Sequence, residues 1–279
     1  MTLTTLLQCN RYGQLGVRIA GPETAEPLVL IHGVGMQSAA WGPQIDALQA
    51  NYRVYAVDMP GHGESSKLSP SNELARMPEY IEWLDAVLDC LELDQVNLAG
   101  HSMGAVISAT YASTHPQRVK RVALVNCIYD RPAASTTAVQ ARAAEIRTGK
   151  MDLETPLKRW FRDIPEEQRL AQQVGNWLAG VDMQGYGTAY TAFAHSDDTY
   201  ADKLKDITCP LLAITGDGDP NSTDAMSIAI AEQTKNGEAV VIKDHRHMIN
   251  ITAPKRVNAE LTRWLQKPTE AANTLGERP

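Results

Sequence analysis

Short apolar runs recur along the chain, and each is followed by turn-forming residues such as glycine, proline or aspartate. Runs without polar alternation are typical of strands that are buried on both faces of a sheet. Between the runs, apolar residues recur at intervals of three and four, the spacing of one face of a helix. The pattern predicts buried strands at residues 27–31, 53–57, 96–99, 120–127, 210–215 and 239–242.

The beginning of the chain shows a different pattern. The segments Leu3–Cys9 and Gln14–Ile19 flank Asn10–Gly13, which predicts an antiparallel hairpin. Beyond it, strands alternate with one helix that starts just after residue 102 and with helices near 40–50, 78–91, 222–234 and 254–266. This alternation predicts an α/β protein whose mainly parallel sheet is covered by helices on both faces.

The alternation stops between residues 128 and 208. Four helices are predicted there instead, near 134–148, 153–161, 166–179 and 183–194. Because the strand pattern returns at 210, we interpret this block as an insertion between the sixth and seventh strands. We predict a core domain of residues 1–127 and 209–266, a helical cap of residues 128–208 over one edge of the sheet, and a mobile tail of residues 267–279.

Composition and charge exclude several classes of partner. The 279 residues carry a net charge of -7 and no block of basic residues, which argues against nucleic acid and anionic membranes. No signal peptide or membrane span is recognisable, so the chain is expected to be cytoplasmic. The four cysteines are scattered, which favours reduced thiols over disulfides or a zinc site, and neither a metal nor a cofactor is expected. The cysteines are Cys9, Cys90, Cys127 and Cys209.

The segment Val96–Val106 ends a predicted strand and begins a predicted helix within a few residues. Its centre reads Gly100-His101-Ser102-Met103-Gly104. A serine at so sharp a turn is held in a strained, exposed corner, and glycine on either side avoids a clash between strand and helix. Ser102 is therefore a candidate nucleophile.

A serine hydroxyl needs a base within hydrogen-bond reach, and the base needs a carboxylate to orient it. With a serine at such a turn, the acid and then the histidine follow it in the chain. Asp217 and Asp219 follow the strand at 210–215, and His245 and His247 follow the strand at 239–242. The carboxyl ends of parallel strands share one edge, where ligands bind, so these side chains are expected near Ser102.

Together with two further loops, these residues resemble an α/β-hydrolase. The loops are His32-Gly33 and Asp58-Met-Pro-Gly-His-Gly-Glu-Ser65, and the resemblance spans almost the whole domain. It implies an eight-stranded sheet with Asp219 as the acid at the end of a Gly-x-x-Asp turn. It also implies His247 as the base, because an apolar residue follows it and a proline opens the last helix seven positions on. The family usually has a small residue before this histidine, whereas this chain has Arg246.

The resemblance further implies two backbone N–H groups that stabilise an oxyanion. Met103 supplies one at the start of the helix after the nucleophile, where the helix dipole also favours negative charge. Val34 supplies the other from the loop after His32-Gly33, with Gly35 as the alternative donor. His32 is expected to brace this loop.

The substrate pocket is expected to lie between this edge of the sheet and the cap. Any cap arginine that turns inward could hold a substrate carboxylate, and the sequence leaves the choice open among Arg131, Arg142, Arg147, Arg159 and Arg162. The candidate pocket residues are Gly35, Met36, Trp41, His101, Ile128, Trp160, Trp177 and Tyr190.

Within the family, the chain resembles the small-cap group of 3-oxoadipate enol-lactonases and related esterases. The residues that carry this likeness are Gly100–Gly104 and Arg159-Trp160-Phe161. It implies hydrolysis of a small-molecule ester or lactone through an acyl-enzyme. The alternatives are amide or carbon–carbon bond hydrolysis of a small acid, or a ligand receptor that retains the hydrolase pocket. Met36-Gln37 and His101 differ from the usual carbon–carbon hydrolase pattern and count against that reaction.

Overall fold

One eight-stranded sheet organises the computed structural model, which describes residues 2–68 and 76–269. Its strand order is β1-β2-β4-β3-β5-β6-β7-β8. The strands are β1 (Thr4–Cys9), β2 (Gly13–Ala20), β3 (Glu26–Ile31), β4 (Tyr52–Val57), β5 (Val96–His101), β6 (Val119–Val125), β7 (Leu211–Gly216) and β8 (Gly237–Ile242).

Only β2 runs against the other seven strands of the sheet. The pairs β1–β2 and β2–β4 are antiparallel, and all pairs from β4 to β8 are parallel. A short 3-10 helix, Asn10–Tyr12, connects β1 to β2, so the predicted hairpin is confirmed. The parallel strands bring the loops that follow β3, β4, β5, β6, β7 and β8 to one edge of the sheet, as the sequence predicts.

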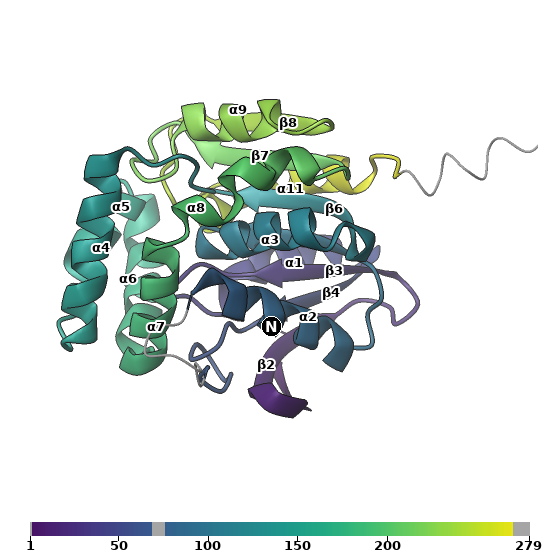
Figure 1. Ribbon diagram of the computed structural model, residues 1–279, viewed down its shortest axis with the longest axis horizontal. Coiled ribbons are helices and arrows are strands. Elements are labelled where there is room, and N and C mark those ends of the chain that lie inside the picture. Colours follow the sequence, from purple (N-terminus) through teal and green to yellow (C-terminus); the bar gives the residue numbers. More distant parts are fainter. Residues whose placement is uncertain (1, 69–75, 270–279) are drawn as a thin grey trace, which may run out of the picture.

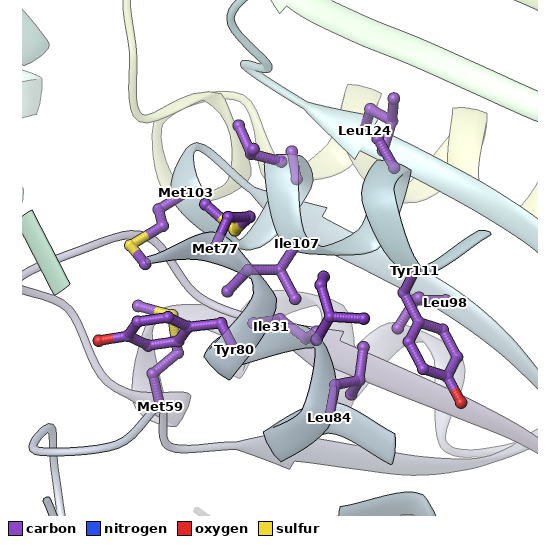
Figure 2. Close-up of a cluster of buried hydrophobic side chains, with 14 of the residues drawn as sticks. Ile31, Met59, Met77, Tyr80, Leu84, Leu98, Met103, Ile107, Tyr111 and Leu124 are labelled. Carbon is purple, nitrogen blue, oxygen red and sulfur yellow. The ribbon is translucent and has the colours of Figure 1, made fainter. Parts of the chain in front are cut away.

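Helices cover both faces of the sheet (Figure 1). α1 (Gly42–Leu48) and α11 (Pro254–Leu265) pack on one face, where Leu28, Ala99 and Trp264 belong to a single buried cluster. α2 (Met77–Cys90) and α3 (Met103–Thr114) cover the other face (Figure 2). The remaining core elements are Ser38–Trp41 and Pro116–Arg118, both 3-10 helices, with α9 (Asp224–Glu232) and α10 (Ile249–Thr252).

α3 is buried along almost its whole length, and ten of its residues are inaccessible to solvent. Figure 2 shows Ile107 and Tyr111 between the sheet and α2, close to Ile31, Leu98 and Leu84. Alternate residues of each strand face the two layers, which is why the strands read as unbroken apolar runs.

The segment between β6 and β7 is helical and gathers beyond one end of the strands (Figure 1). All four helices predicted there are present: α4 (Ala133–Arg147), α5 (Glu154–Trp160), α6 (Pro165–Gly180) and α7 (Met183–Ala194). Two short helices, α8 (Asp197–Tyr200) and Ala201–Asp206, have no counterpart in the prediction because each is too short to show periodicity. The division into core domain and cap at residues 128 and 208 stays a prediction, and most of the predicted tail, residues 270–279, lies outside the described residues.

A disulfide joins Cys9 at the end of β1 to Cys90 at the end of α2, with 5.5 Å between their Cα atoms. The expectation that all four cysteines are reduced is therefore wrong. The pair is 81 positions apart, and only the packing of α2 against β1 brings the two residues together. Cys127 is a free, buried thiol, and burial raises its pKa to about 12. Among the described residues, no helix is long and apolar enough to cross a membrane.

Replacing Cys90 by serine should lower the free energy of unfolding by about 2–4 kcal/mol, because the crosslink restricts the unfolded chain. For a protein of this size the melting temperature should fall by roughly 5–15 °C, measured by scanning calorimetry. Reductant should lower the melting temperature of the wild type and leave that of Cys90→Ser unchanged. A wild-type melting temperature that does not respond to reductant would contradict the expectation.

Candidate active site

Ser102 stands alone between the last residue of β5 and the first residue of α3. Its backbone has φ 53° and ψ -117°, a left-handed conformation that is costly for a residue with a side chain. The chain accepts it because strand and helix pass in backbone contact. A Cβ on Gly100 would overlap the carbonyl of Gly104, and one on Gly104 would overlap the carbonyl of Ile31.

The structure brings Ser102, His247 and Asp219 into one chain of hydrogen bonds. His247 Nδ1 lies 2.7 Å from Asp219 Oδ2, and His247 Nε2 lies 3.0 Å from Ser102 Oγ. An ionised carboxylate can only accept, so Nδ1 carries the proton and Nε2 is left to accept from the serine hydroxyl. All three residues are buried, with exposures of 8%, 4% and 3% for Ser102, His247 and Asp219.

The competing residues point elsewhere. His245 Nδ1 lies 3.0 Å from Thr252 Oγ1, and Asp217 Oδ1 accepts from the backbone N–H of Asp244. Of the alternatives left open by the spacing, the geometry therefore places Asp219 and His247 beside Ser102, and not Asp217 and His245.

Asn126, which the sequence reasoning missed, holds the carboxylate of Asp219. Its Nδ2 donates to Asp219 Oδ2 at 2.8 Å, and the backbone N–H of Asn221 donates to Oδ1 at 2.8 Å. Burial works against ionisation of Asp219, but the interaction with His247 and the hydrogen bonds from Asn221 and Asn126 together outweigh it and hold the pKa of this carboxyl below its usual value. Asn126 has φ 51°, a backbone conformation that asparagine adopts more readily than most residues. An asparagine directly after a buried strand was therefore the feature of the sequence that could have identified this position.

Two backbone N–H groups are available beside the serine hydroxyl. Among the described residues, neither the N–H of Met103 nor that of Val34 has an acceptor. The N–H of Gly35 donates to His62 Nε2 at 3.0 Å and is therefore occupied. This arrangement favours Val34 over Gly35 as the second donor to an oxyanion.

Three buried histidines brace the loops of this edge. His32 Nδ1 donates to the carbonyl of Gly33 and its Nε2 accepts from the N–H of Met59. His101 Nε2 donates to the backbone carbonyl of His247 at 2.9 Å. Burial lowers the pKa of His32 to about 4 and the pKa values of His62 and His101 to about 3, so all three are neutral near pH 7.

Of the predicted pocket residues, His101 and Trp160 both lie beside the base, with ring centroids 5.1 Å and 5.9 Å from that of His247. Ile128 is buried in the same apolar cluster as Val34 and Met103. Tyr190, on α7, packs against this cluster.

The other aromatic and sulfur residues proposed for the pocket belong to two separate buried clusters. Met36 is buried in a small cluster with Phe161, and Trp177 packs against that cluster. Trp41 is fully buried between the sheet and the helices α1 and α11. Trp41 directly precedes α1, and its buried side chain is part of the core and does not line the site.

Arg246, the departure from the family pattern, contacts the cap directly. Its Nη1 donates to the carbonyls of Lys158 and Phe161, at 2.8 Å each, at the end of α5. Its neighbour His245 lies 4.0 Å from the buried carboxylate of Glu167 on α6. The loop that carries His247 is thus attached to two helices of the segment between β6 and β7.

Within residues 2–68 and 76–269, no group of three or more histidine, cysteine, aspartate or glutamate side chains is arranged to hold a metal ion.

Comparison with known proteins agrees with the fold. The family model described as alpha/beta hydrolase fold matches residues 26–149. The enol-lactonase of Burkholderia xenovorans superimposes with a TM-score of 0.84 at 24% identity, covering 94% of this chain and 100% of its own.

Two relatives from Acinetobacter baylyi match over most of their length. (E)-2-((N-Methylformamido)methylene)succinate hydrolase is 47% identical over 86% of this chain and 90% of its own. 3-Oxoadipate enol-lactonase 1 is 30% identical over 90% of this chain and 93% of its own. With a shared sheet and identities at this level and coverage, the chain belongs to the α/β-hydrolase fold family.

Proposed function

We propose that this protein is a serine hydrolase that cleaves the amide bond of a small, carboxylate-bearing substrate through an acyl-enzyme. The hydrogen-bonded line from Ser102 through His247 to Asp219 carries the proposal. In this reading Ser102 is the nucleophile, His247 the general base and then the general acid, and Asp219 the group that orients the imidazole.

In the acylation step, Ser102 Oγ attacks the substrate carbonyl while its proton passes to His247 Nε2, 3.0 Å away. The imidazolium that forms is stabilised by the carboxylate of Asp219. Asp219 stays ionised because its pKa is lowered, so His247 keeps the tautomer that can accept a proton.

The tetrahedral oxyanion accepts from the N–H groups of Met103 and Val34. The first stands at the N-terminus of the 12-residue helix α3, where unpaired N–H groups and the helix dipole favour negative charge. Proton transfer from His247 to the amide nitrogen then releases the amine. Water, activated by the same imidazole, hydrolyses the acyl-enzyme.

The choice of an amide rests on the relative that is 47% identical, whose name describes the hydrolysis of an N-methylformamide on a methylenesuccinate skeleton. Ester or lactone hydrolysis is the second candidate. It is supported by the 30% identical 3-oxoadipate enol-lactonase 1 and by the same set of reacting groups, since this chemistry serves esters as well as amides. A formamide acyl group is small, which suits a serine that is only 8% exposed.

Replacing Ser102 by alanine should abolish turnover, because no other group is placed to form the acyl-enzyme. A panel of N-substituted formamides, lactones and nitrophenyl esters, assayed with the wild type and Ser102→Ala, measures this. Labelling by a fluorophosphonate should disappear together with turnover. Retained labelling of Ser102→Ala would contradict the assignment, and tight saturable binding without turnover in the wild type would favour a receptor.

A histidine pair supplies the matched control for the base. His247→Ala should lower kcat by about three orders of magnitude or more. His245→Ala, two positions away in the same loop, should retain most of the activity. The reverse result would identify His245 as the base.

Replacing Asn126 by glycine should lower kcat by roughly 10- to 100-fold, because a hydrogen bond to the carboxylate of Asp219 is lost. Glycine tolerates the φ of 51° at this position, so the backbone is preserved while the amide is removed. Asn236→Gly is the control. It removes a side-chain amide that donates to the carbonyl of Thr208 and not to Asp219, so kcat should stay unchanged. Equal rates for wild type and Asn126→Gly would exclude a role for this hydrogen bond.

A further inference from the structure

Of the six arginines between β6 and β7, Arg169 is exposed, and the five candidates named from the sequence differ in how their charge is neutralised. Arg131 is bound by both carboxylate oxygens of Asp197, at 2.6 and 2.8 Å. Arg162 is bound by the buried carboxylate of Glu167, at 2.8 and 2.7 Å. Arg147 and Arg159 are exposed to solvent.

Arg142 is half-buried and is paired less closely with a carboxylate than Arg131 and Arg162 are. Its Nη2 donates to the backbone carbonyl of Asp152 at 3.0 Å, while the carboxylate of Asp152 lies 4.0 Å from Nη1 and is itself 51% exposed. The Arg142 side chain is only 23% exposed. A partly buried guanidinium whose carboxylate partner is this loosely placed and exposed gains from a second, closer anion.

Aromatic residues of α7 connect Arg142 to the oxyanion loop. The guanidinium lies 5.9 Å from the ring centroid of Tyr190, and that ring lies 5.8 Å from the ring of Tyr186. At its other end Tyr186 packs on Gly35, where a Cβ would meet the tyrosine ring at 3.0 Å. One continuous wall therefore runs from Gly35, next to Val34, to Arg142.

Charge and burial along this wall agree with an anion site. Burial raises the pKa of Tyr190, and the positive charge of Arg142 is the largest influence that opposes this rise. Tyr190 therefore stays a neutral phenol near pH 7 and can donate a hydrogen bond to an anion. A guanidinium beside a phenol matches the planar, twofold acceptor of a carboxylate.

We propose that Arg142, with Tyr190, binds a carboxylate of the substrate at the α4 end of this wall, while the scissile group lies at the Gly35 end. This inference rests on the proposed function and specifies its substrate class: a small acid whose scissile acyl group reaches the oxyanion loop while its carboxylate reaches α4. The succinate part of the substrate named for the 47% identical relative has this form.

The test compares two esters that differ in charge, mono-nitrophenyl succinate and the neutral nitrophenyl butyrate. For Arg142→Gln, the ratio of kcat/KM between the acidic and the neutral ester should fall by about 10- to 100-fold, the usual worth of a hydrogen bond to a charged group. Arg142→Lys keeps the positive charge but loses the paired N–H donors of the guanidinium. Its ratio of kcat/KM should therefore lie between those of the wild type and Arg142→Gln. Arg147→Gln, on the exposed side of the same helix, should not change it.

A binding experiment separates this inference from the proposed function. Succinate titrated calorimetrically into Ser102→Ala should bind, and binding should weaken at least tenfold when Arg142→Gln is added. If the wild type hydrolyses no acyl substrate but succinate binding depends on Arg142, the site stands and the serine hydrolase proposal fails. If esters are hydrolysed through Ser102 with an unchanged ratio in Arg142→Gln, the carboxylate site is overturned and the hydrolase remains.

A second inference follows from the contacts of Arg246. The two carbonyls that accept from its Nη1, those of Lys158 and Phe161, flank Trp160 in the chain. Trp160 in turn stacks on the imidazole of His247, the residue that follows Arg246. The guanidinium thus attaches the loop of the base to the end of α5, and the indole of α5 packs on the base itself.

We infer that Arg246 is a positioning residue, which aligns His247 by holding the end of α5 and, through it, Trp160. The carbonyls at the end of a helix lack partners within the helix and carry partial negative charge, so a guanidinium suits them. A small residue at position 246 would leave α5 without this attachment to the loop of the base.

A double-mutant cycle tests this coupling with any substrate turned over through Ser102. Arg246→Ala and Trp160→Ala should each lower kcat by roughly tenfold or more, since small displacements of a reacting group are expensive. If both residues act through His247, the decrease in kcat of the double variant should be much smaller than the product of the two single-variant decreases. Arg256→Ala, which removes an exposed arginine paired with Glu260 on α11, should leave kcat unchanged. Independent, multiplicative effects of Arg246→Ala and Trp160→Ala would overturn the inference.

Discussion

The direct backbone contact between α3 and the strands beneath it is the constraint on which the site depends. Because Gly100 and Gly104 carry no side chain, the helix can start against the carbonyl of Ile31 and leave one residue to make the turn. That residue, Ser102, is forced to φ 53°, and its N–H is fixed by the carbonyl of Val125 on the neighbouring strand. One packing contact thus sets the direction of the hydroxyl, the exposure of the Met103 N–H and the axis of the α3 dipole.

Around this corner, burial gives the titratable groups different tasks. His32, His62 and His101 lie in surroundings so poor in water that they remain neutral. His32 and His62 form hydrogen bonds through both ring nitrogens, and His101 forms one through Nε2. Asp219 is equally buried but stays ionised, because several donors converge on its carboxylate. At the same low-dielectric edge of the sheet, the three histidines therefore stay neutral and hold the loops, while the carboxylate of Asp219 stays ionised.

Much of this was readable from the sequence, since periodicity reports which face of an element is buried and parallel strands place their carboxyl ends together. The eight-stranded sheet, the hairpin and the four longer helices between β6 and β7 follow from such local patterns. Choices between near neighbours were harder: Asp217 and Asp219 stand in one turn, and only the path of that turn directs the second toward His247. The Cys9–Cys90 bond, the burial of Trp41 and the contact of Asn126 with Asp219 depend on packing between distant segments, which no local pattern records.

The place where the helical segment leaves the sheet has a consequence for how such proteins diversify. β6 and β7 are direct, parallel neighbours, with Val125 paired to Ile214, so the chain leaves the C-terminal end of β6 and crosses back to the N-terminal end of β7. The sheet is therefore largely indifferent to the length of what is inserted, since the entropy of closing a longer loop rises only slowly. A transplanted cap could bring a new pocket without disturbing the nucleophile. In this chain, however, the inserted segment would have to end a helix where Arg246 can reach it, and this contact limits which segments are interchangeable.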